Sequence, residues 1–187
     1  MLFRSLISHV VKVARHYPFH FTGEIPPHKN PESVDTKLKE LYQTELTRAE
    51  RQRRRRQELS NSQYLRCGQQ WVLLATPGTG FIWESEPLRD MRKVPLVLFG
   101  HSIKLCARTG GAHSVLVKVE GRAWEKTRSK LLNAALTPSP YLLRAKVQST
   151  LEELEVLPYA GTLQQQRSLQ SAINARRRAA GLKRLRP

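Results

Sequence analysis

The sequence predicts an α+β fold in which a small antiparallel or mixed sheet is packed by two helices, with an N-terminal helix and basic extensions. Short apolar runs bounded by glycine and proline indicate strands. Longer segments with apolar residues every three or four positions indicate helices. A hydrophobic content of 40% in 187 residues is sufficient for one domain of ordinary size with extensions.

The first 23 residues have the composition of a mitochondrial import sequence. They contain no acidic residue but include Arg4, Lys12 and Arg15, and a helix over them would gather its apolar side chains on one side. An ordinary basic arm has the same features, and the sequence leaves cleavage open. Residues 24–34 contain three prolines, which is typical of an extended linker. Residues 1–34 are therefore predicted to form an arm and a linker.

Residues 35–62 are predicted to form a separate helical segment, with the helix running to about residue 59 from a cap at Ser33 or Asp35. Its apolar residues recur every three or four positions as far as Ala49, which indicates one buried stripe. From Arg51 onward the run RQRRRR makes the helix basic on every side. Such a helix needs a partner other than a hydrophobic core.

Residues 63–182 are predicted to form the α+β core domain, followed by a basic tail at 183–187. Helices are expected from Gly121 to about Leu136 and at about 163–180, whereas 140–149 fits a helix or a strand. The segment 100–113 is expected to be a mobile insertion. The expected strands are 70–76, 81–84, 94–99, 114–121 and 154–159.

No group of residues in the sequence has the spacing of a catalytic or metal site. His101, Cys106 and His113 are five and seven positions apart, without the short-spaced ligand pair that zinc sites usually contain. The glycines at 76–80 are not followed by the Lys and Ser or Thr of a phosphate loop. We therefore expect no enzyme activity, no cofactor and no small-molecule substrate. No apolar run approaches 18 residues, so no membrane span is expected.

The charge of the chain indicates a polyanionic partner. It has 32 basic and 15 acidic residues, a formal net charge of +17, and the last acidic residue is Glu155. Like charges repel and weaken a compact state, whereas Lys and Arg gain from releasing the counterions of nucleic-acid phosphates. Arginine also binds phosphate in a bidentate manner and stacks on unpaired bases, which favours structured RNA. The predicted RNA contacts are Arg51, Arg53, Arg54, Arg55, Arg56, Arg176, Arg177, Arg178, Lys183, Arg184 and Arg186.

A strand ending in Lys118-Val119-Glu120-Gly121 is followed, two residues later, by Trp124 and an amphipathic helix with Leu131 and Leu132. Together with Pro95 and the pair Gly110-Gly111, this pattern resembles the mitochondrial large-ribosomal-subunit protein forty-nine family over about residues 64–182. Several extra residues between Pro95 and Gly110 depart from that pattern. From the residues themselves, Gly121 would let the chain turn into the helix without a side-chain clash. Trp124 would be a core residue.

The resemblance implies a sheet-and-two-helix fold like the small initiation-factor (SUI-type) domain. It implies a structural constituent of the large subunit of the mitochondrial ribosome, located in the mitochondrial matrix and without catalytic activity. Its partners would be ribosomal RNA and other mitochondrial ribosomal proteins. Two alternatives share the basic arms: a small-subunit or ribosome-assembly protein of mitochondria, and an accessory subunit of a respiratory membrane complex. In the last case, the arms would meet anionic lipid.

Overall fold

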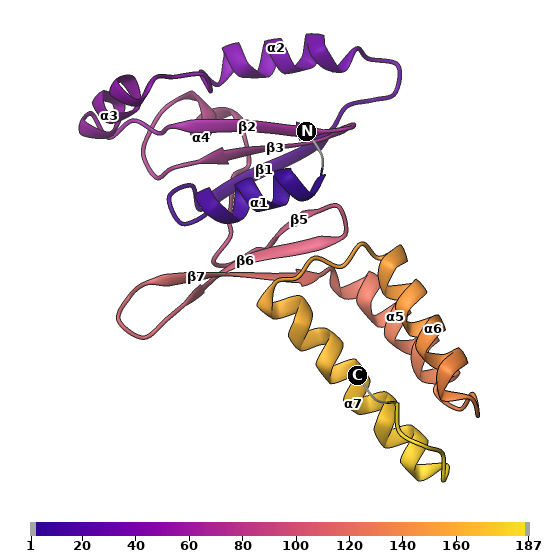
Figure 1. Ribbon diagram of the computed structural model, residues 1–187. Helices are drawn as coiled ribbons and strands as arrows, with labels where there is room; N and C mark the ends of the chain where they lie inside the picture. The colour runs from indigo at the N-terminus through magenta and orange to yellow at the C-terminus, as the bar shows by residue number, and fades with distance from the viewer. Residues whose placement is uncertain (1–2, 186–187) are drawn as a thin grey trace. The chain divides into compact units, whose positions relative to one another are not determined.

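The structure, a computed structural model, describes residues 3–185 and divides into two compact units (Figure 1). The N-terminal unit comprises the chain up to Leu98 together with Ile103–Val115. The C-terminal unit comprises Phe99–Ser102 and the chain from Leu116 onward. Over the described residues the chain forms seven helices and two antiparallel sheets, which confirms the predicted α+β class.

A four-stranded sheet forms the centre of the N-terminal unit. Strands β2 (Ser62–Cys67) and β3 (Gln70–Ala75) make a hairpin, and β1 (Phe19–Glu24) pairs with the other edge of β3. The two-residue strand β4 (Arg89–Asp90) pairs with β1, giving the order β2-β3-β1-β4. Residues 1–34 are predicted to lie outside the core, but their segment Phe19–Glu24, β1, belongs to this sheet.

Helices cover both faces of this sheet. The helix α1 (Phe3–Val13) buries Leu6, Ile7 and Val10, and His9 Nε2 lies 3.0 Å from Gln63 Oε1 on β2. The next residue of β2, Tyr64, projects from the opposite face, because side chains alternate along a strand. There its hydroxyl donates a hydrogen bond of 2.6 Å to Asp35 of α2 (Pro31–Leu41). The short helix α4 (Phe81–Ser85) belongs to the hydrophobic cluster on that face.

Asp35 fixes α2 to the sheet through charge as well as packing. Arg66 of β2 donates from Nε to both carboxylate oxygens of Asp35, at 2.7 and 2.9 Å. Burial by itself raises the pKa of Asp35, but the hydrogen bonds from Arg66 and Tyr64 outweigh it and hold the pKa below its usual value. Arg66 is therefore paired with a carboxylate within its own unit.

The second sheet consists of β5 (Leu96–Leu98), β6 (His101–Ala107) and β7 (His113–Val119), in the order β5-β6-β7. The division between the units runs through the β6–β7 hairpin. Gly110 and Gly111 have φ of +89° and +80°, as a strand-connecting turn requires of them. The segment 100–113, expected to be a mobile insertion, therefore holds a seven-residue strand, β6, and its turn.

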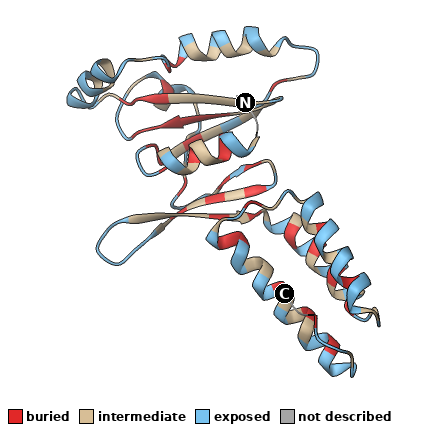
Figure 2. Ribbon diagram, in the orientation of Figure 1, coloured by how far each residue is buried: buried red, intermediate tan, exposed pale blue. Residues whose placement is uncertain are grey.

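Three helices form the core of the C-terminal unit: α5 (Gly121–Ala134), α6 (Pro140–Glu153) and α7 (Ala160–Ala179). Their inner faces bury Leu131, Leu143 and Ile173, and Trp124 is 8% exposed, which confirms it as a core residue. Figure 2 shows the buried residues along the facing sides of these helices. Gly121 is the first residue of α5 with open space where a Cβ would be, so the expected steric need for glycine is not found.

Three further sequence predictions are wrong. The single helix predicted over 35–59 is two helices, α2 and α3 (Arg48–Arg56), and α2 is capped by Asn30. The expected strand 81–84 is the helix α4, because Ile82 and Trp83 pack into the hydrophobic cluster from one helical turn. The expected strand 154–159 is a connection between α6 and α7, where Thr162 accepts the Tyr159 amide at 3.1 Å and donates to Tyr159 O.

No helix within residues 3–185 combines the length and the apolar character that crossing a membrane requires.

Candidate nucleic-acid interface

Helix α3 begins at a capping box. The Thr47 hydroxyl accepts the Glu50 amide at 3.3 Å, and the Glu50 carboxylate accepts the Thr47 amide at 2.7 Å. The hydrogen bonds from the side chain and the amide of Thr47 lower the pKa of Glu50 below its ordinary value, because they stabilise the ionised carboxylate. The box fixes where the helix starts and therefore which arginines face outward.

Two of the predicted RNA contacts on α3 are used to dock the helix. Arg54 donates from Nε and Nη2 to the Ser60 carbonyl, at 3.1 and 2.8 Å, and from Nη1 to Gln43 Oε1 at 2.6 Å. Arg51 donates from Nη2 to the Thr44 carbonyl at 3.1 Å. Because their partners are neutral, both guanidinium groups keep an uncompensated positive charge beneath the helix.

The outer side of α3 carries four exposed arginines: Arg48, Arg53, Arg55 and Arg56. Within residues 3–185, no ion pair joins any of them to a carboxylate. Figure 2 shows α3 without a buried residue, in contrast to α1. A helix with this composition gains no stability from a hydrophobic face, so its exposed charges are free for an external partner.

Three neighbouring hollows extend the charge of α3 across the N-terminal unit. One, of about 490 Å³, is lined by Arg48, Arg51 and Arg55, and the next, of about 680 Å³, by Arg55, Arg15 and His16. A third, of about 440 Å³, is lined by Arg15, His16, Lys12 and Arg108. Among the described residues that line these three hollows, one is acidic, Glu58. We call this the α1–α3 basic surface, made by Lys12, Arg15, His16, Arg48, Arg51, Arg53, Arg55, Arg56 and Arg108.

The sequence prediction included Arg51, Arg53, Arg55 and Arg56 of this surface. It did not include Arg48 on the same helix, nor Lys12, Arg15, His16 and Arg108. Lys12 lies in the last turn of α1, Arg15 in the turn that follows it, and Arg108 directly after β6. These positions meet because α1 packs onto the sheet instead of forming an arm. A tertiary arrangement of this kind leaves no local signal in the sequence.

The predicted contacts of the C-terminal unit divide into exposed and buried residues. Arg176 and Arg178 are exposed at the end of α7, whereas Arg177 between them is 0% exposed. The guanidinium of Arg177 donates to four backbone carbonyls, those of Lys183, Ala135, Thr137 and Pro138. Arg177 is therefore a structural residue that has no free donor face for RNA, and we remove it from the interface.

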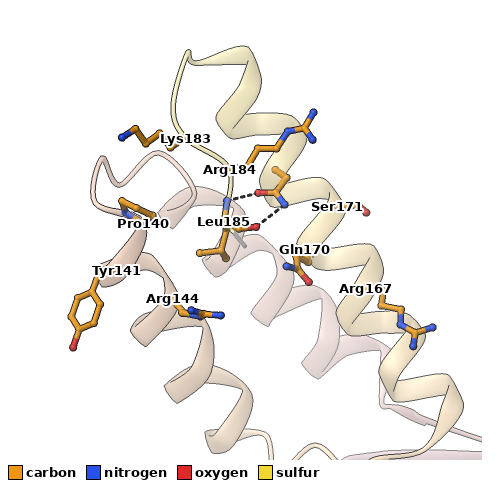
Figure 3. Close-up of a pocket in the computed structure, with 10 residues that line it drawn as sticks. Pro140, Tyr141, Arg144, Arg167, Gln170, Ser171, Lys183, Arg184 and Leu185 are labelled. Carbon is orange, nitrogen blue, oxygen red and sulfur yellow. Dashed lines mark hydrogen bonds between the residues drawn. The ribbon is translucent and has the colours of Figure 1, made fainter. Parts of the chain in front are cut away.

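The segment after α7 folds back instead of extending away. Leu185 is 7% exposed, and its amide and carbonyl bond the side-chain amide of Asn174 at 2.7 and 3.0 Å (Figure 3). Lys183 and Arg184 are exposed beside this pair. The predicted contact Arg186 lies outside the described residues.

His101, Cys106 and His113 lie on β6 and at the start of β7. His101 is buried, with Nδ1 2.9 Å from the Phe99 carbonyl oxygen. In the part of the chain that the structure describes, no three His, Cys, Asp or Glu side chains gather as they would around a metal ion.

Comparisons of the chain with protein-family models, curated proteins and solved structures found no match.

Proposed function

We propose that this protein is an RNA-binding structural constituent of the mitochondrial ribosome, in its large subunit, and that the α1–α3 basic surface holds ribosomal RNA. The four exposed arginines of α3, which have no carboxylate partner in the described residues, carry the proposal. Phosphates would neutralise them and release counterions, and their fork-shaped donors suit phosphate oxygens.

The arrangement of the surface supports RNA over a lipid bilayer as its partner. Its basic residues other than Arg53 and Arg56 line three neighbouring hollows rather than a flat face, so they can follow a bent, ridged polyanion such as an RNA backbone. The outer side of α3 has arginines, glutamine and Ala49 but no bulky apolar residue to insert into lipid. The mitochondrial location and the large subunit rest on the composition of the first 23 residues and on the resemblance around Lys118–Trp124. On the same resemblance, we also propose that the sheet and helices are related to the SUI-type fold.

Binding of a structured RNA by the purified full-length chain tests the surface. Replacing Arg48, Arg53, Arg55 and Arg56 by Gln removes four charges without touching the docking residues Arg51 and Arg54. If all four contact phosphates, the slope of log affinity against log salt becomes shallower by about 3.6, since each duplex phosphate contributes about 0.9. The matched control replaces four other exposed cations by Gln: Lys29, Lys37, Arg122 and Lys126. Equal slopes for the two variants would contradict the proposal.

Sedimentation of a tagged copy in a mitochondrial lysate tests the assembly. Comigration with the large subunit after a high-salt wash is the expected result. Comigration with the small subunit or with assembly intermediates would indicate the alternative ribosomal role. Recovery with membranes would indicate a respiratory-complex subunit and would overturn the ribosomal assignment.

A further inference from the structure

The C-terminal unit contains a hollow of about 1040 Å³ between the start of α6, the second half of α7 and the returning tail (Figure 3). We call it the α6–α7 hollow. Four basic residues line it, and none of its described lining residues is acidic. The full lining is Pro140, Tyr141, Arg144, Arg167, Gln170, Ser171, Asn174, Lys183, Arg184 and Leu185.

The hollow is held in shape by the bonds that fix the tail. Arg177 binds the Lys183 carbonyl, and Asn174 binds both backbone groups of Leu185, so Lys183 and Arg184 are held at its rim. None of these three hydrogen bonds uses the charged end of Lys183 or Arg184. A tail fixed in this way supplies cations at defined places.

Tyr141 is the exposed aromatic residue of this hollow. The residue is 78% exposed, the largest exposed fraction among the large hydrophobic residues that the structure describes as exposed. Figure 3 shows it pointing outward from the first turn of α6, with Arg144 one turn further on the same helix. A planar ring with this exposure offers a face on which an unpaired base can stack. Gln170, on the α7 side, has an amide that can donate to and accept from the edge of a base.

We propose that the α6–α7 hollow binds an unpaired nucleotide of single-stranded RNA, with the base stacked on Tyr141 and the phosphates bound by Lys183 and Arg184. This inference rests on the proposed function, because it assigns a second RNA contact to the same protein. It differs from the α1–α3 basic surface in the form of RNA that it prefers. Cations combined with an exposed ring suit a single strand, whereas cations alone suit a phosphate backbone of any form.

The test uses the full-length chain and two fluorescent probes, a 12-nucleotide single-stranded RNA and an RNA duplex of the same sequence. We expect Tyr141→Ala to weaken single-strand binding about tenfold and to leave duplex binding unchanged. Tyr141→Phe keeps the ring and should bind the single strand as the unmodified chain does. The double variant Lys183→Gln, Arg184→Gln should also weaken single-strand binding. Circular dichroism checks that each variant is folded, which is expected because the three side chains are exposed.

The variant of the four α3 arginines separates this inference from the proposed function. In that background, single-strand binding should persist and should be lost on adding Tyr141→Ala. If single-strand binding is the same with and without Tyr141, the inference is overturned while the role of the α1–α3 basic surface stands. If replacing the α3 arginines leaves duplex binding unchanged while single-strand binding requires Tyr141, the proposed role of the α1–α3 basic surface is contradicted. The inference about the α6–α7 hollow is then still supported. Binding of anionic vesicles that depends on Tyr141 and displaces the single strand would also overturn the inference.

Discussion

Arg177 donates a hydrogen bond from Nη1 to the carbonyl oxygen of Ala135 across 2.8 Å, joining the basic end of α7 to the end of α5. The last carbonyls of a helix have no partner within the helix itself. Arg177 satisfies the one at Ala135, and its remaining donors reach Thr137, Pro138 and Lys183. One arginine from a run of three therefore closes the connection between α5 and α6 and holds the tail.

Replacing Arg177 by Ala should lower the free energy of unfolding by about 3 kcal/mol, because the buried Ala135 carbonyl and three partly buried carbonyls lose a charged donor. Lys at this position has too few donors to satisfy all four and should lose most of that stability. Replacing the exposed neighbours Arg176 or Arg178 by Ala should change it by less than about 0.5 kcal/mol. Urea unfolding followed by circular dichroism measures these differences. Equal effects at 176, 177 and 178 would show that Arg177 has no special structural role.

The burial of Arg177 could have been predicted from the sequence. Leu169, Ile173 and Arg177 follow one another at steps of four, so they lie along one face of α7, and the first two are its inner residues. The break between α2 and α3 also had a signal, because Thr47-x-x-Glu50 is the sequence pattern of a capping box. The apolar spacing continues across the break between α2 and α3, so periodicity alone predicts one helix. Arg177 is predicted to be exposed with its neighbours because arginine is rarely fully buried.

Other features had no local signal. β3 and β7 are predicted from their apolar runs, whereas β1 and β2 mix apolar with polar residues and become strands by pairing with the two edges of β3. Trp83 lies in a helix because its ring meets the edge of Phe19, with centroids 4.7 Å apart, a contact between segments distant in the sequence. The α1–α3 basic surface has the same origin. Tertiary contacts determine the secondary structure of these segments, and local propensity does not predict it.

Gly161 in the first turn of α7 should not tolerate a side chain. A Cβ at this position would lie 2.3 Å from the Val117 carbonyl oxygen, which is backbone and cannot move aside readily. Gly161→Ala should therefore destabilise the protein, although alanine in a helix is usually favoured over glycine by about 1 kcal/mol. Gly121→Ala at the start of α5 is the matched control, since nothing lies within 4 Å of its Cβ position. A thermal melt of each variant should show a lower midpoint for Gly161→Ala alone, and a raised midpoint there would refute the clash.

Helix α1 should be required for stability. Leu6, Ile7 and Val10 are each 0% exposed, so they belong to the core of the N-terminal unit. Leu6→Ala should cost about 3 kcal/mol of unfolding free energy, as truncation of buried leucines generally does. Lys12→Ala, on the exposed side of the same helix, should cost less than about 0.5 kcal/mol. Denaturant unfolding compares the two, and a fully stable Leu6→Ala variant would mean that α1 is not a structural part of the unit.

His20 should make stability depend on pH. The imidazole is 3% exposed, with Nε2 3.2 Å from the Val94 carbonyl oxygen, and burial, aided by the charge of Arg89, lowers its pKa below 6.5. Above pH 6.5 the imidazole is neutral in both states and contributes no pH dependence. Below pH 6.5 the unfolded chain binds a proton that the folded chain does not, so the free energy of unfolding falls by up to about 1.4 kcal/mol per pH unit until the folded-state pKa is reached.

His20→Gln retains an amide donor for Val94 and should lose this slope between pH 7 and 5, whereas His28→Gln, at an exposed position, should keep it. Urea titrations at several pH values measure the slopes, and an undiminished slope in His20→Gln would assign the effect to another group.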